Sequence, residues 1–296
     1  MFIVTNRNIV DEDGTDFGVV GDVFNAEGPN RLRMLEATKK GRNWNLRVLP
    51  DKLTEDLLTE AGIDKPTNGD PVFASEYLFR KTIASAKADQ QSPKHIVFFV
   101  HGFNNTLEDV VVRCDGLAKN FGVEVVAFSW PANGGITGAA SYLDDKRDAQ
   151  SSVVAFDRAL DRARELLQKM RESVIESITK KLAEKVPVNS ERFRELLAVE
   201  AQKHCPIRAT LLLHSMGNYL LERTMKSTAL RGHLPLFENI LLCAADVNNL
   251  GHEEWVDRLQ VRNRLYVAIN ESDNALRASR MKGGGRTART FGPLDQ

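Results

Sequence analysis

Five short apolar runs alternate with helical patterns along residues 96–269, and this alternation constrains the fold more than any other feature of the sequence. Each run has the length and the aliphatic composition of a strand that is buried on both faces of a parallel sheet. The runs are 96–100, 123–128, 209–213, 240–243 and 264–269. The sequence therefore predicts an α/β fold with a mostly parallel central sheet and helices on both faces.

The chain of 296 residues is long enough for one large α/β domain, and we expect 1–296 to form a single domain. Residues 1–70 predict three short strands joined by polar turns, placed as an antiparallel edge of the sheet. The segment 153–203 keeps helical spacing of its apolar residues in a charged background and is interrupted at "VPVN". It predicts an inserted helical hairpin that projects from the domain, with mostly solvated charges.

The composition excludes several classes of partner. The 40 basic and 40 acidic residues balance, so no net field draws the chain to nucleic acid or to an anionic membrane. No apolar run approaches the roughly 20 residues that span a bilayer. The three cysteines lack metal-type spacing, so free thiols in a reducing cytoplasm are expected. A phosphate-binding loop and a His/Glu metal pair are both missing, so neither a cofactor nor a metal is predicted.

The stretch 207–221, "IRATLLLHSMGNYLL", predicts a strand that turns directly into a helix, with Ser215 at the bend. This is the arrangement of a nucleophile elbow, which lifts a serine hydroxyl above the end of a sheet. Leu213 departs from the usual Gly-x-Ser-x-Gly pattern at its first position, whereas Gly217 keeps its second small residue. The alternative interpretation is structural, because serine is also a good helix cap.

A second motif, "VFFVHGFNNT", follows the first parallel strand and resembles the His-Gly oxyanion loop of α/β-hydrolases. Together with "FSWPANG", "YLDDKRDAQSS", "CAADVN" and "SDNALRAS" in this order, it makes residues 72–293, apart from the long helical hairpin, resemble a bacterial, uncharacterised family of serine-hydrolase-like, esterase- or lipase-like proteins. The resemblance implies the α/β-hydrolase fold, with Ser215 as nucleophile. It also implies that the backbone N–H groups of Phe103 and Met216 form the oxyanion hole.

The acid and the base of a catalytic triad are less well determined. Asp246 and Asp273 each follow a strand after the elbow; the superfamily places its acid more often at the position of Asp273, which we favour. Each could instead be a helix cap or turn residue. In this fold the base is a histidine that follows the acid, yet no histidine follows Asp273. His101 is the best-placed substitute, although its alternative role is to shape the oxyanion loop; His252 is a more distant candidate.

Two functions are compatible with these residues. The first is a cytoplasmic serine hydrolase that cleaves a carboxylic ester or a related acyl bond of a small-molecule substrate. The second is a non-catalytic hydrolase-fold binding module that lacks the triad histidine and contacts a protein partner through the helical hairpin.

Overall fold

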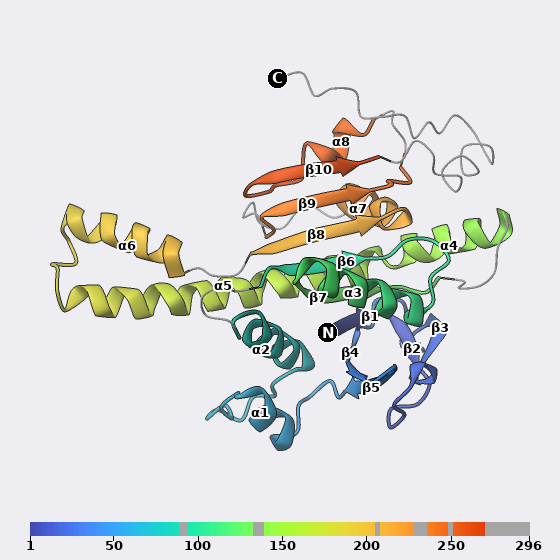
Figure 1. Cartoon of the computed structure of the whole chain (residues 1–296), viewed down its shortest axis with the longest axis horizontal. Coiled ribbons are helices and arrows are strands. Elements are labelled where there is room, and N and C mark those ends of the chain that lie inside the picture. Colours follow the sequence, from blue (N-terminus) through green and yellow to red (C-terminus); the bar gives the residue numbers. More distant parts are fainter. Residues whose placement is uncertain (89–93, 133–138, 205–207, 228–235, 248–250, 270–296) are drawn as a thin grey trace.

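An eight-stranded sheet forms the centre of the protein in the computed structural model, which describes residues 1–88, 94–132, 139–204, 208–227, 236–247 and 251–269 (Figure 1). Its strand order is β10-β9-β8-β6-β7-β1-β4-β5. The strands are β1 (Phe2–Thr5), β4 (Arg33–Lys40), β5 (Asn43–Leu49), β6 (Ile96–Val100), β7 (Glu124–Ser129), β8 (Ala209–His214), β9 (Asn239–Cys243) and β10 (Arg264–Ala268). All pairs from β10 to β1 are parallel, whereas β4 pairs antiparallel with β1 and β5. The predicted mostly parallel sheet is confirmed.

Helices cover both faces of this sheet. The helices are α1 (Glu55–Ala61), α2 (Ala74–Ala86), α3 (Leu107–Phe121), α4 (Ala139–Ser151), α5 (Val153–Ala183), α6 (Glu191–His204), α7 (Met216–Ser227) and α8 (Glu253–Val256), with a short 3-10 helix, η1 (Phe17–Val19). Val97 and Phe99 of β6 face α3, and the alternate residues Phe98 and Val100 face the core beneath α5 and α7. This alternation follows from the two-residue period of a strand, and it places apolar side chains on both faces.

The N-terminal strands differ from the expected antiparallel edge. β1 lies inside the sheet and pairs in parallel with β7, so only β4 and β5 form an antiparallel edge. The predicted strand around residues 17–24 forms η1 and β3 (Val20–Phe24), and β3 pairs with β2 (Arg7–Ile9) in a separate two-stranded ribbon. β1 carries three consecutive apolar residues, which suits an interior strand covered on both faces.

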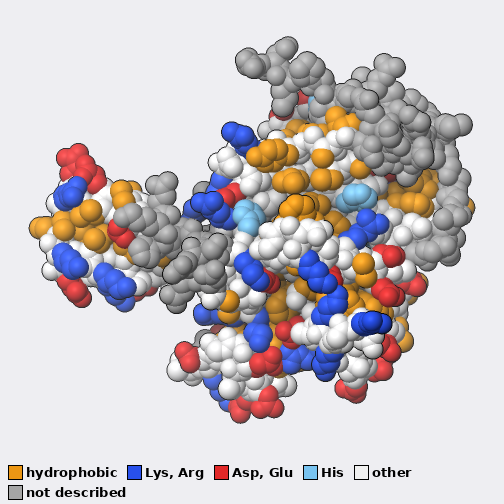
Figure 2. Space-filling model, viewed as in Figure 1, with side chains coloured by type: hydrophobic (Ala, Val, Ile, Leu, Met, Phe, Trp, Pro, Cys, Tyr) orange, Lys and Arg blue, Asp and Glu red, His pale blue; other side chains and the backbone are white. Residues whose placement is uncertain are grey.

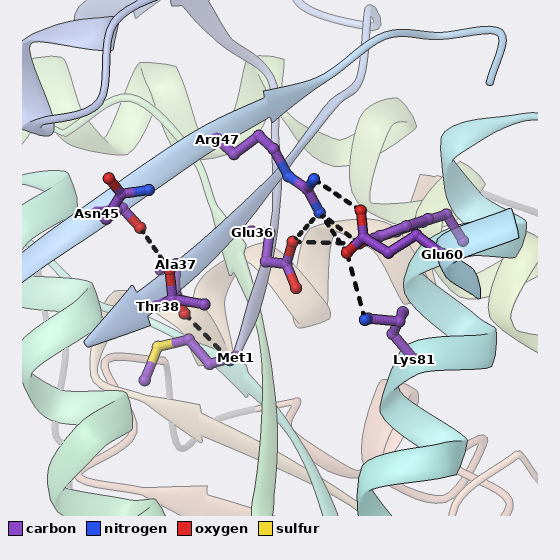
Figure 3. A network of polar contacts seen from close by, with 9 residues as sticks. Met1, Glu36, Ala37, Thr38, Asn45, Arg47, Glu60 and Lys81 are labelled. Atoms are coloured by element: carbon purple, nitrogen blue, oxygen red, sulfur yellow. Dashed lines mark hydrogen bonds and ion pairs between the residues drawn. The ribbon is translucent and has the colours of Figure 1, made fainter. Parts of the chain in front are cut away.

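A polar cluster fixes α1 and α2 to the antiparallel edge (Figure 3). Glu60 of α1 accepts hydrogen bonds from Arg47 Nη1 at 2.9 Å and from the Tyr77 hydroxyl at 2.6 Å, and Lys81 lies 3.3 Å away. Arg47 also pairs with Glu36. The hydrogen bonds to Arg47 and Tyr77 lower the pKa of Glu60 to about 2. The Glu60 carboxylate therefore stays ionised across the neutral range, and its bonds stabilise this corner of the sheet.

The segment predicted as a helical hairpin forms α5 and α6, and its distal part projects beyond the sheet (Figures 1 and 2). The first turns of α5 belong to the main core, where Val153, Phe156 and Ala159 are buried. The limits 153–203 for an insertion therefore stay a prediction, and the structure shows that α5 is partly a core helix. Among the described residues, no helix combines the length and apolar character required to cross a bilayer.

Candidate active site

Ser215 lies between the last residue of β8 and the first residue of α7, with a backbone φ of 51°. A side chain in this left-handed region is strained, because its Cβ crowds the following carbonyl. The other two non-glycine residues with positive φ among those described are Asn104 and Ala244, which follow β6 and β9. All three therefore lie at the carboxyl edge of neighbouring strands, and such concentrated strain is typical of functional sites.

Two glycines let the Ser215 bend and the loop after β6 approach each other. A Cβ on Gly102 would lie 2.8 Å from Ser215 Cβ and 2.9 Å from the His214 carbonyl oxygen. A Cβ on Gly217 would lie 2.8 Å from the His101 carbonyl oxygen. Both spacings exclude any larger residue, so the two predicted motifs are in direct contact. Within the described chain, the Ser215 hydroxyl, which is partly exposed, forms no hydrogen bond.

His101 is fully buried, and backbone groups contact both of its ring nitrogens. The Trp130 N–H donates to Nε2 at 3.1 Å, and Nδ1 lies 2.9 Å from the Gly102 carbonyl oxygen, to which it donates. The imidazole stacks on the Trp130 ring with centroids 4.9 Å apart. These partners require a neutral ring with its proton on Nδ1. Burial, and then the nearby positive charge of Arg7, lower the pKa of His101 from 6.5 to about 3.

This burial predicts an acid-sensitive native state. Above pH 6.5, His101 is neutral in both the folded and unfolded chain; below it, the unfolded chain binds a proton that native His101 does not bind. The free energy of unfolding should therefore fall by about 1.4 kcal/mol per pH unit as pH decreases from 6.5 towards 3. Urea unfolding between neutral pH and about pH 5 measures this slope. His101→Gln should flatten it, and equal slopes in wild type and His101→Gln would contradict the assignment.

Two buried charged side chains, Arg7 and Asp145, form hydrogen bonds with the backbone of the loop 101–105. Arg7 of β2 is fully buried; its Nη2 donates to the Asn105 carbonyl oxygen at 2.8 Å and its Nε to Ser129 Oγ at 3.2 Å. Asp145 of α4, also fully buried, accepts the Asn104 N–H at 2.8 Å. The strained φ of Asn104 is thus maintained by a charge-assisted hydrogen bond. Together these contacts fix the backbone that carries Phe103.

The two predicted oxyanion donors have unused N–H groups. Met216 is the first residue of α7, where the backbone N–H has no partner within its own helix. Within the described chain, neither the Met216 N–H nor the Phe103 N–H donates a hydrogen bond. Phe103 lies partly exposed beside the Ser215 bend and packs edge-on against Tyr142, with ring centroids 5.6 Å apart. Two free donors next to a serine could bind a developing negative charge.

Asp246 lies beside Ser215, since its backbone N–H donates to the Ser215 carbonyl oxygen at 3.3 Å. Its carboxylate accepts the Tyr142 hydroxyl at 2.6 Å. The other predicted acid, Asp273, lies outside the described residues. The choice between the two acids therefore stays a prediction.

Of the remaining histidines, His214 ends β8 directly before Ser215, and the others are spread over the molecule. His95 lies at the opposite edge of the sheet, where its Nε2 is 2.6 Å from Thr210 Oγ1. His252 precedes α8, and its Nδ1 is 3.4 Å from a Glu253 oxygen. His233 lies outside the described residues, and His204 ends α6. Among the described residues, no hydrogen bond joins an imidazole to the Ser215 hydroxyl.

Sequence reasoning missed several residues that shape this site. Asn218 is fully buried, and its Nδ2 donates to the carbonyl oxygens of Ser215 at 3.0 Å and Cys243 at 3.1 Å. Arg7, Tyr142 and Asp145 were likewise not identified as site residues. The acidic stretch "YLDDKRDAQSS" contained a signal for two of them, because Tyr142 and Asp145 are both in it. Arg7 had no local signal, since Asn105 and Ser129, its two partners at the site, lie about a hundred residues away along the chain.

Comparison with known families adds to this geometry. Residues 78–176 and 171–290, which together span most of the chain, match the family described as "Alpha/beta hydrolase of unknown function (DUF900)". No curated protein and no solved structure matches the chain. The family match and the parallel sheet confirm the predicted α/β-hydrolase fold. The chain therefore belongs to this family of α/β-hydrolases of unknown function.

Proposed function

We propose that this protein is a serine hydrolase that cleaves a carboxylic ester or a related acyl bond, with Ser215 as the nucleophile. The observation that carries the proposal is the left-handed backbone of Ser215 between β8 and α7, packed against Gly102 of the neighbouring loop. A strained bend of this kind exposes the hydroxyl at the carboxyl edge of the sheet, where open α/β sheets bind ligands.

In the proposed reaction, Ser215 Oγ attacks the acyl carbon while its proton passes to a base. The carbonyl oxygen becomes an oxyanion, and the N–H groups of Phe103 and Met216 donate to it. The leaving group departs with a proton, and water then releases the acid from the acyl-serine. Asp246 or Asp273 acts as the acid partner. The proposal gives His101 the role of holding the loop, because its ring nitrogens already bond to backbone groups.

A fluorophosphonate probe tests the proposal, since it forms a covalent adduct only with an activated serine. We expect a single adduct on Ser215, detected by intact mass and peptide mapping, and none in Ser215→Ala. Ser227→Ala, at the distal end of α7, is the matched control and should label as the wild type does. A labelling rate that rises with pH near 6 to 7 would indicate a histidine base. Labelling that persists in Ser215→Ala would contradict the proposal.

A non-catalytic binding module is the second candidate. It is favoured by the lack of a hydrogen bond to the Ser215 hydroxyl within the described chain. A contact with a protein partner through the helical hairpin is supported by the exposed apolar side chains of Ile175 in α5, Val188 between the helices and Val199 in α6. A folded protein whose Ser215 fails to label at any pH would favour this candidate. A cytoplasmic location is part of both proposals and rests on the unpaired Cys114 and Cys243.

A further inference from the structure

The side-chain amide of Asn218 binds two carbonyl oxygens at the Ser215 bend. Asn218 is fully buried in the first turn of α7, and its Nδ2 donates to the Ser215 carbonyl oxygen at 3.0 Å and to the Cys243 carbonyl oxygen at 3.1 Å. The Leu213 carbonyl oxygen lies 3.4 Å from the same nitrogen. Because all three neighbours are acceptors, the amide must present its nitrogen here and not its oxygen.

Neither of the two bound carbonyl oxygens depends on this side chain for a partner. The Ser215 oxygen also accepts the backbone N–H groups of Asn218 at 3.0 Å and Asp246 at 3.3 Å, and the Cys243 oxygen accepts the Ser215 N–H at 2.9 Å. The Asn218 Oδ1 atom is buried without a partner in the described chain, which costs free energy that an apolar side chain would not. What the amide adds is a fixed direction for the Ser215 carbonyl.

That direction also fixes an N–H group of the proposed oxyanion hole. The Ser215 carbonyl and the Met216 N–H belong to one planar peptide unit, and no peptide bond in the described chain is cis. In a trans unit the C=O and the N–H point in opposite directions. A bond that holds the carbonyl towards Asn218 therefore directs the Met216 N–H away from it. The same bond polarises the peptide unit, so its N–H becomes a stronger donor.

The second proposed oxyanion donor is held in the same way. The Phe103 N–H shares its peptide unit with the Gly102 carbonyl, whose oxygen accepts the His101 Nδ1–H at 2.9 Å. Asn105 Nδ2 donates to the same oxygen at 3.3 Å. Both His101 and Asn105 are buried. Each of the two N–H groups thus has a buried side-chain donor on the opposite side of its own peptide unit.

We propose that Asn218 is a positioning residue of the oxyanion hole, because its amide fixes the Ser215–Met216 peptide unit with the Met216 N–H directed at the oxyanion. The proposal rests on the proposed serine hydrolase function. It adds to that function a residue that acts through the backbone and does not touch the reacting atoms. The bond to Cys243 at the end of β9 keeps the strained bend in place while the reaction proceeds.

The rate of fluorophosphonate labelling at Ser215 of the full chain tests this role. Asn218→Leu removes both donated bonds and adds no charge. It should label about 10- to 100-fold more slowly, a smaller loss than the roughly 100- to 1000-fold that follows removal of an oxyanion donor. The matched control is Thr224→Val, which removes another buried side-chain bond of α7, from Thr224 Oγ1 to the Leu220 carbonyl oxygen at 2.8 Å. The control should label at the wild-type rate.

The pH profile of Asn218→Asp separates positioning from a general loss of stability. The new carboxyl group is buried against two carbonyl oxygens, and Asp246 and Glu222 add negative charge on the adjoining loop and the next turn of α7. Its pKa should therefore lie well above the ordinary value of about 3.9. When protonated it donates one bond; when ionised it donates none and repels both oxygens. Labelling relative to the wild type should fall as pH rises from about 5 to 8, whereas Asn218→Leu should be slowed by the same factor throughout.

Two results would overturn the proposal and leave the serine hydrolase function standing. One is labelling of Asn218→Leu at the wild-type rate. The other is labelling of Asn218→Asp at the wild-type rate across the whole pH range. Because Asn218→Asp is compared with itself at different pH values, the test stays decisive if Asn218→Leu does not fold.

A wild-type Ser215 that labels at no pH would instead contradict the hydrolase function, and urea unfolding then decides the role of Asn218. At a φ of 51°, Ser215→Gly should unfold at a higher urea concentration than Ser215→Ala. This difference should narrow when Asn218→Leu is added to both variants, because the bend is then free to relax. A difference that Asn218→Leu leaves unchanged would overturn the proposal.

Discussion

Replacing Arg7 with methionine is expected to lower the free energy of unfolding by about 3–5 kcal/mol, the range found when one partner of a buried ionic network is removed. The guanidinium is fully buried and donates to Asn105 and Ser129 as well as to Asp22. Its positive charge also compensates the negative charges of Asp145 and Asp148. Methionine fills a similar volume but donates no hydrogen bond. The Asn105 carbonyl oxygen therefore loses its donor from Arg7, and the buried Asp145 carboxylate loses the nearby positive charge of Arg7.

Urea unfolding of Arg7→Met beside the exposed control Arg42→Met measures this loss. The loss should be greater near pH 8 than near pH 5. Burial already raises the pKa of Asp148 to about 6, and Arg7 is one of the charges that lower it. Without Arg7 this pKa rises further, so the native state is penalised more as pH increases and the carboxyl must ionise. A loss below about 1 kcal/mol would show that water enters the space left by the guanidinium.

Replacing Ser215 should separate activity from stability. Ser215→Gly and Ser215→Ala are both expected to reduce ester hydrolysis by orders of magnitude, because the proposed nucleophile is missing and only the residual acceleration from the oxyanion hole and substrate binding is left. At a φ of 51° the glycine variant should be more stable than the alanine variant by about 1 kcal/mol, since glycine has no Cβ to strain. Steady-state assays with a short-chain aryl ester and urea unfolding give the two results.

The control for this comparison is Ser85, an exposed residue of helix α2. There alanine should be more stable than glycine by about 0.5–1 kcal/mol, the usual order in a helix. The reversed order at Ser215 would show that the native backbone, and not the residue type, holds the strain. The same order at both positions would mean that the bend relaxes in solution. Hydrolysis at the wild-type rate in both Ser215 variants would exclude this serine as the nucleophile.

The parallel half of the sheet could be predicted from the sequence because each strand there is a local signal. The run "IVFFV" is apolar at every position, and the structure places it as β6 with both faces covered. The helix predicted at 107–121 was found with the same limits as α3, where Thr106 and Asp109 form a capping box. Periodicity and capping depend only on neighbouring residues, so one sequence is enough to show them.

The N-terminal topology could not be predicted in this way. β4 was missed because its sequence, "RMLEATKK", has charged residues at both ends and only a weak alternation. β1 was placed at an edge because nothing near it indicates its parallel partner, β7, which lies more than a hundred residues later. In the candidate site the same limit applied to His101. Its environment depends on Trp130, which follows the neighbouring strand β7. Sequence spacing indicated which residues gather at the carboxyl edge, but not which of their polar atoms are already bonded.

The interior position of β1 has a consequence for how this protein is made. The Thr5 hydroxyl donates to the carbonyl of Ser129, so the two ends of one hydrogen bond leave the ribosome 124 residues apart. At 5–20 residues per second this interval lasts about 6–25 s. β4 can pair with one side of β1 early, while the other side, flanked by Phe2, Ile3 and Val4, waits for β7. A nascent chain therefore exposes an unpaired apolar strand edge for many seconds, and slow translation without chaperones should favour its aggregation.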